Sequence, residues 1–183
     1  MIPQSMAHIL AFAGSNSLTS INYKLLKFTT TLLQPHQVKR KDMAQFSVPM
    51  YSADVEKNEG FPEVIVALKE DITAASALVL SVNEHNGNPS AYFKNVVDWL
   101  SRLDKNFLEG KPIFLMATSP GKQGGSNALE VAKKMLTHFG ARIVTTFSLP
   151  SFNTNFDPDK GIIDRTLAHE HKRGVALFLT NIT

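Results

Sequence analysis

The stretch HILAFAGSNSLTSIN, residues 8–22, joins a short apolar run to a turn rich in hydroxyl side chains. The apolar run from His8 to Gly14 ends in a glycine, which predicts a buried β-strand. A helical pattern of apolar residues begins directly after the polar turn, at Ile21. The order strand, polar turn and helix is the first unit expected of an α/β fold.

The same alternation of strand and helix continues along the chain. Apolar runs at 77–82 and 112–118 predict two more buried strands. A more polar strand near an edge is expected at 37–43, and a partly alternating strand at 142–149. Helical spacing predicts helices over the ranges 21–33, 61–75, 91–103, 127–139 and 164–179, with Asp164 as an N-cap and Gly140 just after a helix end.

Parallel strands joined by right-handed helical crossovers are the simplest arrangement for five such repeats. We therefore predict an α/β fold with three layers, α/β/α, and a five-stranded parallel sheet of the flavodoxin-like order 2-1-3-4-5. In that order a ligand is expected at the carboxyl ends of the strands, near the switch between strands one and three.

Composition limits the possible function classes. The chain has 183 residues, a net charge of +3 and 43% hydrophobic residues, so we expect a single domain, residues 1–183. The mild charge, without a basic and aromatic block, argues against nucleic acid as a partner. The absence of cysteine excludes disulfides, thiolate nucleophiles and cysteine-ligated metals, and no metal site is expected. The N-terminal stretch resembles neither a signal peptide nor a membrane anchor, so we expect a cytoplasmic protein without membrane contacts.

The loops after strands one, three and four are GSNSLTSIN, NEHNGNPS and SPGKQGGSN, and all three are rich in Gly, Ser and Asn. In the first loop, free backbone N–H groups at a helix start favour an anion such as phosphate. Ser15, Ser20 and Asn22 are the expected side-chain donors, whereas Ser17 and Thr19 can equally face solvent. No Walker or GxGxxG spacing is present, and an ordinary N-cap stays the alternative interpretation.

The second and third loops are expected to contact a planar ligand. Glu84 is expected to orient its loop by accepting backbone N–H bonds, and His85 either to contact the ligand or to be a surface residue. Glycines of the third loop let the backbone approach a ligand closely. The expected binding residues are Ser15, Ser17, Ser20, Ile21, Asn22, Asn83, Glu84, His85, Asn86, Gly87, Ser119, Pro120, Gly121, Gly124 and Gly125, and no general acid or base is assigned.

Three motifs make the chain similar to the NADPH-dependent FMN reductase family. Its Gly-Ser-x-Arg-x-x-Ser-x-Asn loop is matched by Gly14, Ser15, Ser20 and Asn22, although Ser17 stands where the family has Arg. Its Pro-Glu-Tyr-Asn and Leu-Lys-Asn-x-x-Asp-Trp segments correspond to NEHNGNPSAYFKNVVDWLSR, residues 83–102, where Asn83 replaces Pro and His85 replaces Tyr. Its Ser-Pro-Gly-x-x-Gly-Gly segment is matched at 119–125. The resemblance extends from about residue 8 to 149.

The resemblance implies non-covalent FMN, with its phosphate on the first loop and its ring between the second and third. It also implies NADPH or NADH as electron donor, a quinone, azo dye, free flavin or similar small molecule as acceptor, and a homodimer or homotetramer. Without the family's Arg, phosphate binding depends on hydroxyls and amides. Two alternatives stay open: a flavodoxin-like one-electron carrier without an NAD(P)H site, and a sensing or structural domain that has lost its flavin.

Further expectations concern single residues outside the three loops. Lys94, Asp98 and Arg102 are spaced for i,i+4 ion pairs, and Trp99 is expected in the core or at a subunit interface. By charge alone, Lys122 and Arg102 are candidates to contact the ribose phosphate of NADPH. The segment 150–161, PSFNTNFDPDKG, is expected to be a plain exposed loop rather than a cover for a neighbouring flavin.

Overall fold

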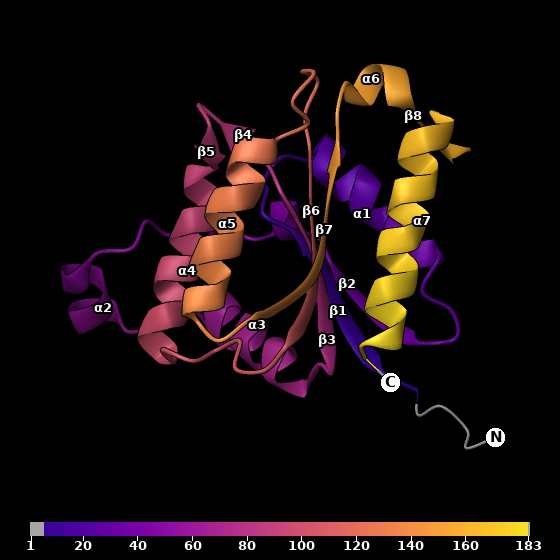
Figure 1. Cartoon of the computed structure of the whole chain (residues 1–183). Helices are drawn as coiled ribbons and strands as arrows, with labels where there is room; N and C mark the ends of the chain where they lie inside the picture. Colours follow the sequence, from indigo (N-terminus) through magenta and orange to yellow (C-terminus); the bar gives the residue numbers. More distant parts are fainter. Residues whose placement is uncertain (1–5, 183) are drawn as a thin grey trace.

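A five-stranded parallel sheet forms the centre of the protein in the computed structural model, which describes residues 6–182 (Figure 1). Its order is β2-β1-β3-β6-β7, and every neighbouring pair is parallel. The strands are β1 (His8–Ala13), β2 (Gln37–Lys41), β3 (Ala77–Val82), β6 (Pro112–Thr118) and β7 (Arg142–Leu149). With the short hairpins set aside, this is the predicted 2-1-3-4-5 order, and the polar strand β2 lies at an edge as expected.

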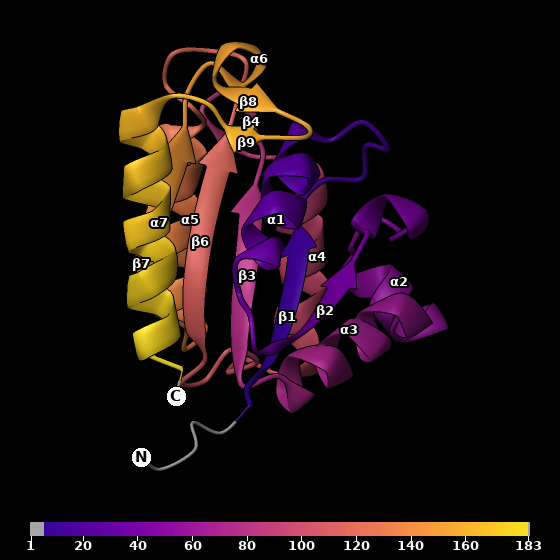
Figure 2. The ribbon, with the colours of Figure 1, turned by 90° about the vertical axis from the view of Figure 1, so that its right-hand side faces the viewer.

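Helices cover both faces of the sheet, which confirms the predicted three layers (Figures 1 and 2). One face packs against α1 (Ile21–Thr31) and α7 (Arg165–Thr180), the other against α3 (Glu63–Ala74), α4 (Ala91–Leu103) and α5 (Ser126–His138). Side chains alternate along β1 accordingly: Ile9 belongs to the α1/α7 core, and Leu10 to the opposite core. Because β3 and β6 are buried along their whole length, their apolar runs are explained by helices on both faces.

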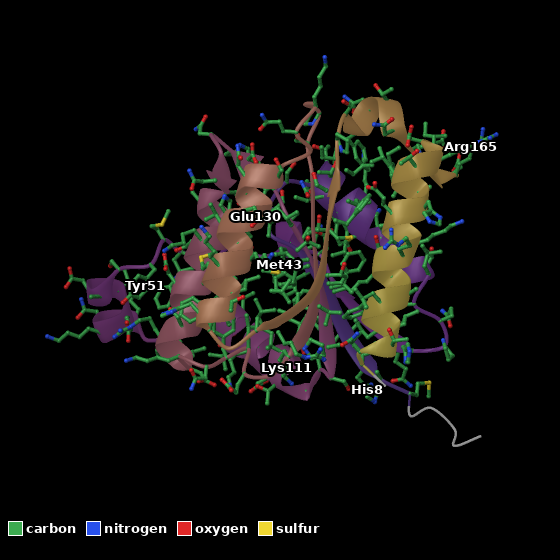
Figure 3. The ribbon with its side chains drawn as sticks, viewed as in Figure 1. His8, Met43, Tyr51, Lys111, Glu130 and Arg165 are labelled. Carbon is green, nitrogen blue, oxygen red and sulfur yellow. The ribbon has the colours of Figure 1, made fainter. Side chains whose placement is uncertain are left out.

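Most helix limits follow local signals in the sequence. Asp164 caps α7 by accepting a hydrogen bond from Leu167 N at 2.9 Å, and Gly140 adopts φ 92° just after α5. Trp99 is fully buried, which settles its position in favour of the core. Met43, which follows β2, points into the same core as Trp99, on the side of the sheet that α3, α4 and α5 cover (Figure 3).

Several short elements were not predicted. They are the helical turn η1 (Met43–Gln45), the helix α2 (Ala53–Glu59), the hairpin of β4 (Glu84–His85) and β5 (Asn88–Pro89), the short helix α6 (Phe152–Asn155), and the hairpin of β8 (Phe156–Asp157) and β9 (Gly161–Ile162). The prediction of a plain exposed loop at 150–161 is wrong, because Phe152 and Phe156 are buried and their rings stack at 4.7 Å.

The predicted ion pair between Asp98 and Arg102 is also wrong. Lys94 pairs with Asp98 as expected, but the Arg102 guanidinium reaches Glu56 of α2, with Nε and Oε2 2.9 Å apart. The partner of Arg102 therefore comes from α2, a helix that was not predicted, and not from its own helix α4. Among the helices of residues 6–182, none has the length and apolar character needed to cross a membrane.

Candidate functional site

The loops that follow β1, β3 and β6 meet at the carboxyl edge of the sheet, the upper edge in Figure 1. Together they line an open cavity of about 300 Å³. The expected residues that line it are Ser15, Ser17, Ser20, Ile21, Asn22, Asn83, Glu84, His85, Ser119 and Pro120, joined by Thr19 and Thr118. The other expected residues, Asn86, Gly87, Gly121, Gly124 and Gly125, belong to the same loops but do not line the cavity.

The first loop is folded by its own hydroxyl groups. Ser15 Oγ accepts a hydrogen bond from Ser17 N, and Ser17 Oγ accepts one from Thr19 N, each at 3.3 Å. Ser20 is the N-cap of α1 and accepts from Tyr23 N at 3.2 Å, so the ordinary N-cap interpretation holds for its side chain. The N–H groups of Ser15, Asn16 and Leu18, however, donate no hydrogen bond within residues 6–182.

These free N–H groups stand before the N-terminus of an eleven-residue helix. The helix dipole and unpaired donors together attract an anion at this position. The arrangement therefore suits a phosphate group without a guanidinium.

Asn22 has a role that sequence reasoning missed. Its side chain is buried, and Nδ2 donates to Thr118 O at 3.0 Å. Oδ1 accepts from Thr118 N at 3.0 Å and from Ser81 Oγ at 2.8 Å. One of the two Nδ2 protons is therefore used within the protein, and the side chain joins the start of α1 to the carboxyl ends of β3 and β6.

The second loop is a hairpin whose turn residues, Asn86 and Gly87, have φ angles of 53° and 75°. Two central residues with positive φ are typical of a type I′ turn, and the dipeptide Asn-Gly is its usual sequence signal. His85 is exposed, and its Nε2 lies 3.1 Å from Asn83 Nδ2. The Oδ1 atom of Asn83 is buried without a hydrogen-bond partner in the described residues, so an acceptor beside the cavity is unsatisfied.

Glu84 connects the second loop to the third. Its Oε2 accepts a hydrogen bond from Ala128 N, in the first turn of α5, at 3.0 Å. The N-cap of α5 is Gly125, which has no side chain, so Glu84 supplies the missing cap from another loop. The prediction that Glu84 accepts a backbone N–H is confirmed, although the N–H belongs to the neighbouring helix.

The third loop is compact and depends on two glycines. Gly124 and Gly125 have φ angles of 61° and 80°, a region that disfavours other residues. A Cβ added to Gly124 would lie 2.4 Å from Ser148 Oγ. The segment after β7 supports this loop: Ser151 N donates to Gly121 O at 2.8 Å, and Phe152 N donates to Ser119 O at 3.0 Å.

The two cations that charge alone suggested differ in position. Arg102 is at the far end of α4 from the carboxyl edge and is paired with Glu56. Lys122 is exposed in the third loop, two residues after Pro120, which lines the cavity. Of the two cations, only Lys122 belongs to a loop that lines the cavity.

The residues present suit FMN. Free N–H groups before α1 match a phosphate, an unsatisfied acceptor on Asn83 matches a ring N–H, and the loops contribute both polar and apolar lining. A parallel sheet of this order with a cavity at its carboxyl edge defines the flavodoxin-like class of proteins.

The chain belongs to the NADPH-dependent FMN reductase family, whose pattern matches residues 7–154. It is 35% identical over 126 residues to the quinone reductase of Escherichia coli, covering 67% of each chain. It is 31% identical over 121 residues to an NAD(P)H-dependent FMN reductase of Pseudomonas aeruginosa, covering 66% of this chain and 64% of that protein. FerB, a flavoenzyme NAD(P)H:(acceptor) oxidoreductase from Paracoccus denitrificans, superposes with a TM-score of 0.77 at 26% identity, covering 97% of both chains.

These similarities confirm the family that the three motifs indicated. The protein is an oxidoreductase of a flavin-dependent class, with FMN as its cofactor and NAD(P)H as its electron donor.

Proposed function

We propose that the protein binds FMN non-covalently in the cavity of the three loops and passes electrons from NADPH or NADH to a small acceptor. Quinones and azo compounds are the acceptor classes we favour. The main support is that the loops after β1, β3 and β6 line a single cavity. The relatives named quinone reductase and NAD(P)H:(acceptor) oxidoreductase support the acceptor class.

In this proposal the first loop holds the phosphate. The free N–H groups of Ser15, Asn16 and Leu18 are the donors, and the hydroxyls of Ser15 and Ser20 can still donate their protons. Asn22 acts indirectly, because its side chain fixes the start of α1. Ser17 stands where the family has Arg, so backbone donors carry more of the binding free energy here.

The second and third loops hold the ring in this proposal. Asn83 Oδ1 is the acceptor for a ring N–H, and Ser119 and Pro120 of the third loop border the ring. FMN supplies the capacity to accept a hydride and to pass electrons on. The chain's own task is to hold the ring, exclude water from one side and leave the other side open to donor and acceptor.

His85 is the residue we assign to contact with the acceptor. Its ring is exposed at the cavity, and it stands where the family has Tyr. A ring that donates and accepts hydrogen bonds suits the carbonyl of a quinone. Glu84 is assigned a positioning role, because its carboxylate holds the hairpin to α5.

We further propose that residues 1–183 form one domain that works in the cytoplasm as a homodimer or homotetramer. The family resemblance is the basis for the assembly, and light scattering on the purified chain measures its mass. The mass of a single chain, at concentrations up to about 100 μM, would contradict the assembly.

The function is tested by anaerobic titration of the FMN-loaded protein with NADPH and, separately, NADH. We expect the absorbance near 450 nm to bleach with one equivalent of donor per flavin and to return when a quinone is added. Bound FMN that does not bleach would favour a one-electron carrier. A protein that retains no FMN would favour a domain without redox function.

A further inference from the structure

The helices α1 and α7 and the hairpin of β8 and β9 lie on the opposite side of the sheet from α5 (Figures 1 and 2). Residues from these elements line a second cavity. Its volume is about 250 Å³. Its apolar walls are Phe28 from α1, Leu32 directly after α1, Ile162 from β9 and Ala168 from α7. These walls and this volume suit one aromatic ring of a small molecule.

The polar end of this cavity is the imidazole of His171. The residue is 1% exposed, and its Nε2 lies 2.8 Å from Thr29 Oγ1. Thr29 Oγ1 also lies 2.9 Å from Leu25 O and 3.4 Å from Met116 Sδ. We assign the single hydroxyl proton to Leu25 O, so that Thr29 accepts from His171 and the ring proton is on Nε2. Burial lowers the pKa of His171 to about 4, which keeps the ring neutral at pH 7.

The other ring nitrogen, Nδ1, is then a bare acceptor. It has no hydrogen-bond partner within residues 6–182. Among residues 6–182, Asn83 Oδ1 is the only fully buried side-chain nitrogen or oxygen without a hydrogen-bond partner. Because His171 Nδ1 also has no partner in this range, it must keep some exposed surface. Because His171 lines the cavity, an O–H or N–H group of a ligand there can donate to Nδ1.

Two lysines give the mouth of the cavity a positive charge. Lys160 and Lys172 both line it, both are exposed, and neither forms an ion pair within the described residues. The nearby carboxylate of Asp157 is turned to its own turn, where it accepts from the N–H groups of Asp159 and Lys160. Backbone N–H groups and, to a smaller extent, the charge of Lys160 lower the pKa of Asp157, but no ion pair within residues 6–182 holds either lysine, so both ammonium groups can face an anion.

We propose that this cavity binds a small hydroxyaromatic carboxylate. Its ring lies between Phe28 and Ile162, its hydroxyl donates to His171 Nδ1, and its carboxylate faces Lys160 and Lys172. The site is separate from the cavity of the three loops, with which it shares no lining residue. The two cavities are still connected through the chain. Helix α1 begins at the first loop, and the segment 150–162, which supplies Lys160 and Ile162, supports the third loop through Ser151 N and Phe152 N.

The test is isothermal titration calorimetry on the full-length, FMN-saturated protein with 4-hydroxybenzoate as the probe. For a ligand of this size we expect a Kd of about 1 mM or below. Benzoate lacks the hydroxyl donor and phenol lacks the carboxylate, so each is expected to bind at least about tenfold more weakly. FMN saturation prevents the probe from binding at the flavin site.

Variants locate the binding. The double variant Lys160→Ala/Lys172→Ala changes only exposed side chains and is expected to weaken 4-hydroxybenzoate about fivefold or more without altering phenol binding. Ala168→Leu fills the cavity and is expected to abolish binding of both. Lys133→Ala, an exposed lysine on α5, is the matched control and leaves both affinities unchanged.

A second measurement follows the ring nitrogen itself. The ¹⁵N chemical shift of His171 Nδ1 is expected to move on addition of 4-hydroxybenzoate, and not on addition of benzoate. No heat of binding up to about 10 mM probe, equal affinities for the three probes, or binding that Ala168→Leu leaves intact would each overturn the proposal.

Discussion

Replacing Asn22 with alanine tests how the carboxyl edge of the sheet is held together. The variant removes three buried hydrogen bonds at once: Nδ2 to Thr118 O, Thr118 N to Oδ1 and Ser81 Oγ to Oδ1. No water reaches the side chain readily, since Asn22 is only 2% exposed. The N–H and C=O of Thr118 and the hydroxyl of Ser81 then lose these partners.

The expected loss of stability follows from those three polar groups. A buried polar group left without a partner costs about 1–3 kcal/mol. The Ser81 hydroxyl can rotate toward another acceptor, so we count it at the low end of the range. The free energy of unfolding should therefore fall by about 3–7 kcal/mol, a large part of the roughly 5–15 kcal/mol typical of a domain.

Urea unfolding of the apoprotein, followed by far-ultraviolet circular dichroism, measures this change. The midpoint should fall while the slope m stays constant. Asn127→Ala is the matched control, because the Asn127 side chain is exposed and its contact with Gln123 is 3.4 Å long. The control should change stability by less than about 0.5 kcal/mol. A loss below about 1 kcal/mol for Asn22→Ala would refute the reasoning that this side chain joins three elements.

Glu84→Ala removes the cap on Ala128 N and should lower the free energy of unfolding in urea by about 1–2 kcal/mol. Glu84→Gln keeps an acceptor and should lower it by less than half of that, so equal losses for the two variants would exclude the side chain as the cap. The pKa of His171 is about 4 in the folded protein and 6.5 without the burial, so the unfolded chain binds more protons between these values. The free energy of unfolding should therefore fall by up to about 3 kcal/mol from about pH 7.5 to pH 4. His171→Gln, which keeps an N–H for Thr29, should lose much of that pH dependence, and an unchanged pH dependence in this variant would contradict a buried neutral His171 as its cause. Gly124→Ala should weaken FMN binding about tenfold or more in a fluorescence titration, since a Cβ there meets the backbone of 149–150 within 3 Å; wild-type affinity would show that the loop adjusts freely.

The fold could be predicted from the sequence because its signals are local. The apolar runs of β3 and β6 report burial on both faces, and the limits of α4 coincide with the predicted 91–103. Loops rich in Gly, Ser and Asn after three parallel strands must lie at one edge, and the structure brings them to one cavity.

The site could be predicted only in part, because tertiary partners decide what each polar side chain does. The motif marks Asn22 as important, but its hydrogen bonds to Thr118 and Ser81 depend on residues 96 and 59 positions away. The hairpin at 84–89 had a recognisable signal in Asn86–Gly87 that the sequence interpretation passed over. The support that Phe152 gives to Ser119 had no such signal, since it arises from a backbone N–H.

The central claim is that backbone N–H groups before α1 bind the phosphate of FMN in the absence of the family's Arg. The measurement that tests it most directly compares FMN with riboflavin, which lacks the phosphate, by quenching of flavin fluorescence on titration of the apoprotein. Two charge-assisted hydrogen bonds are worth about 3 kcal/mol or more, so FMN should bind at least about 100-fold more tightly, and the advantage should shrink in Ser15→Ala/Ser20→Ala. Equal affinities for the two flavins would contradict the account.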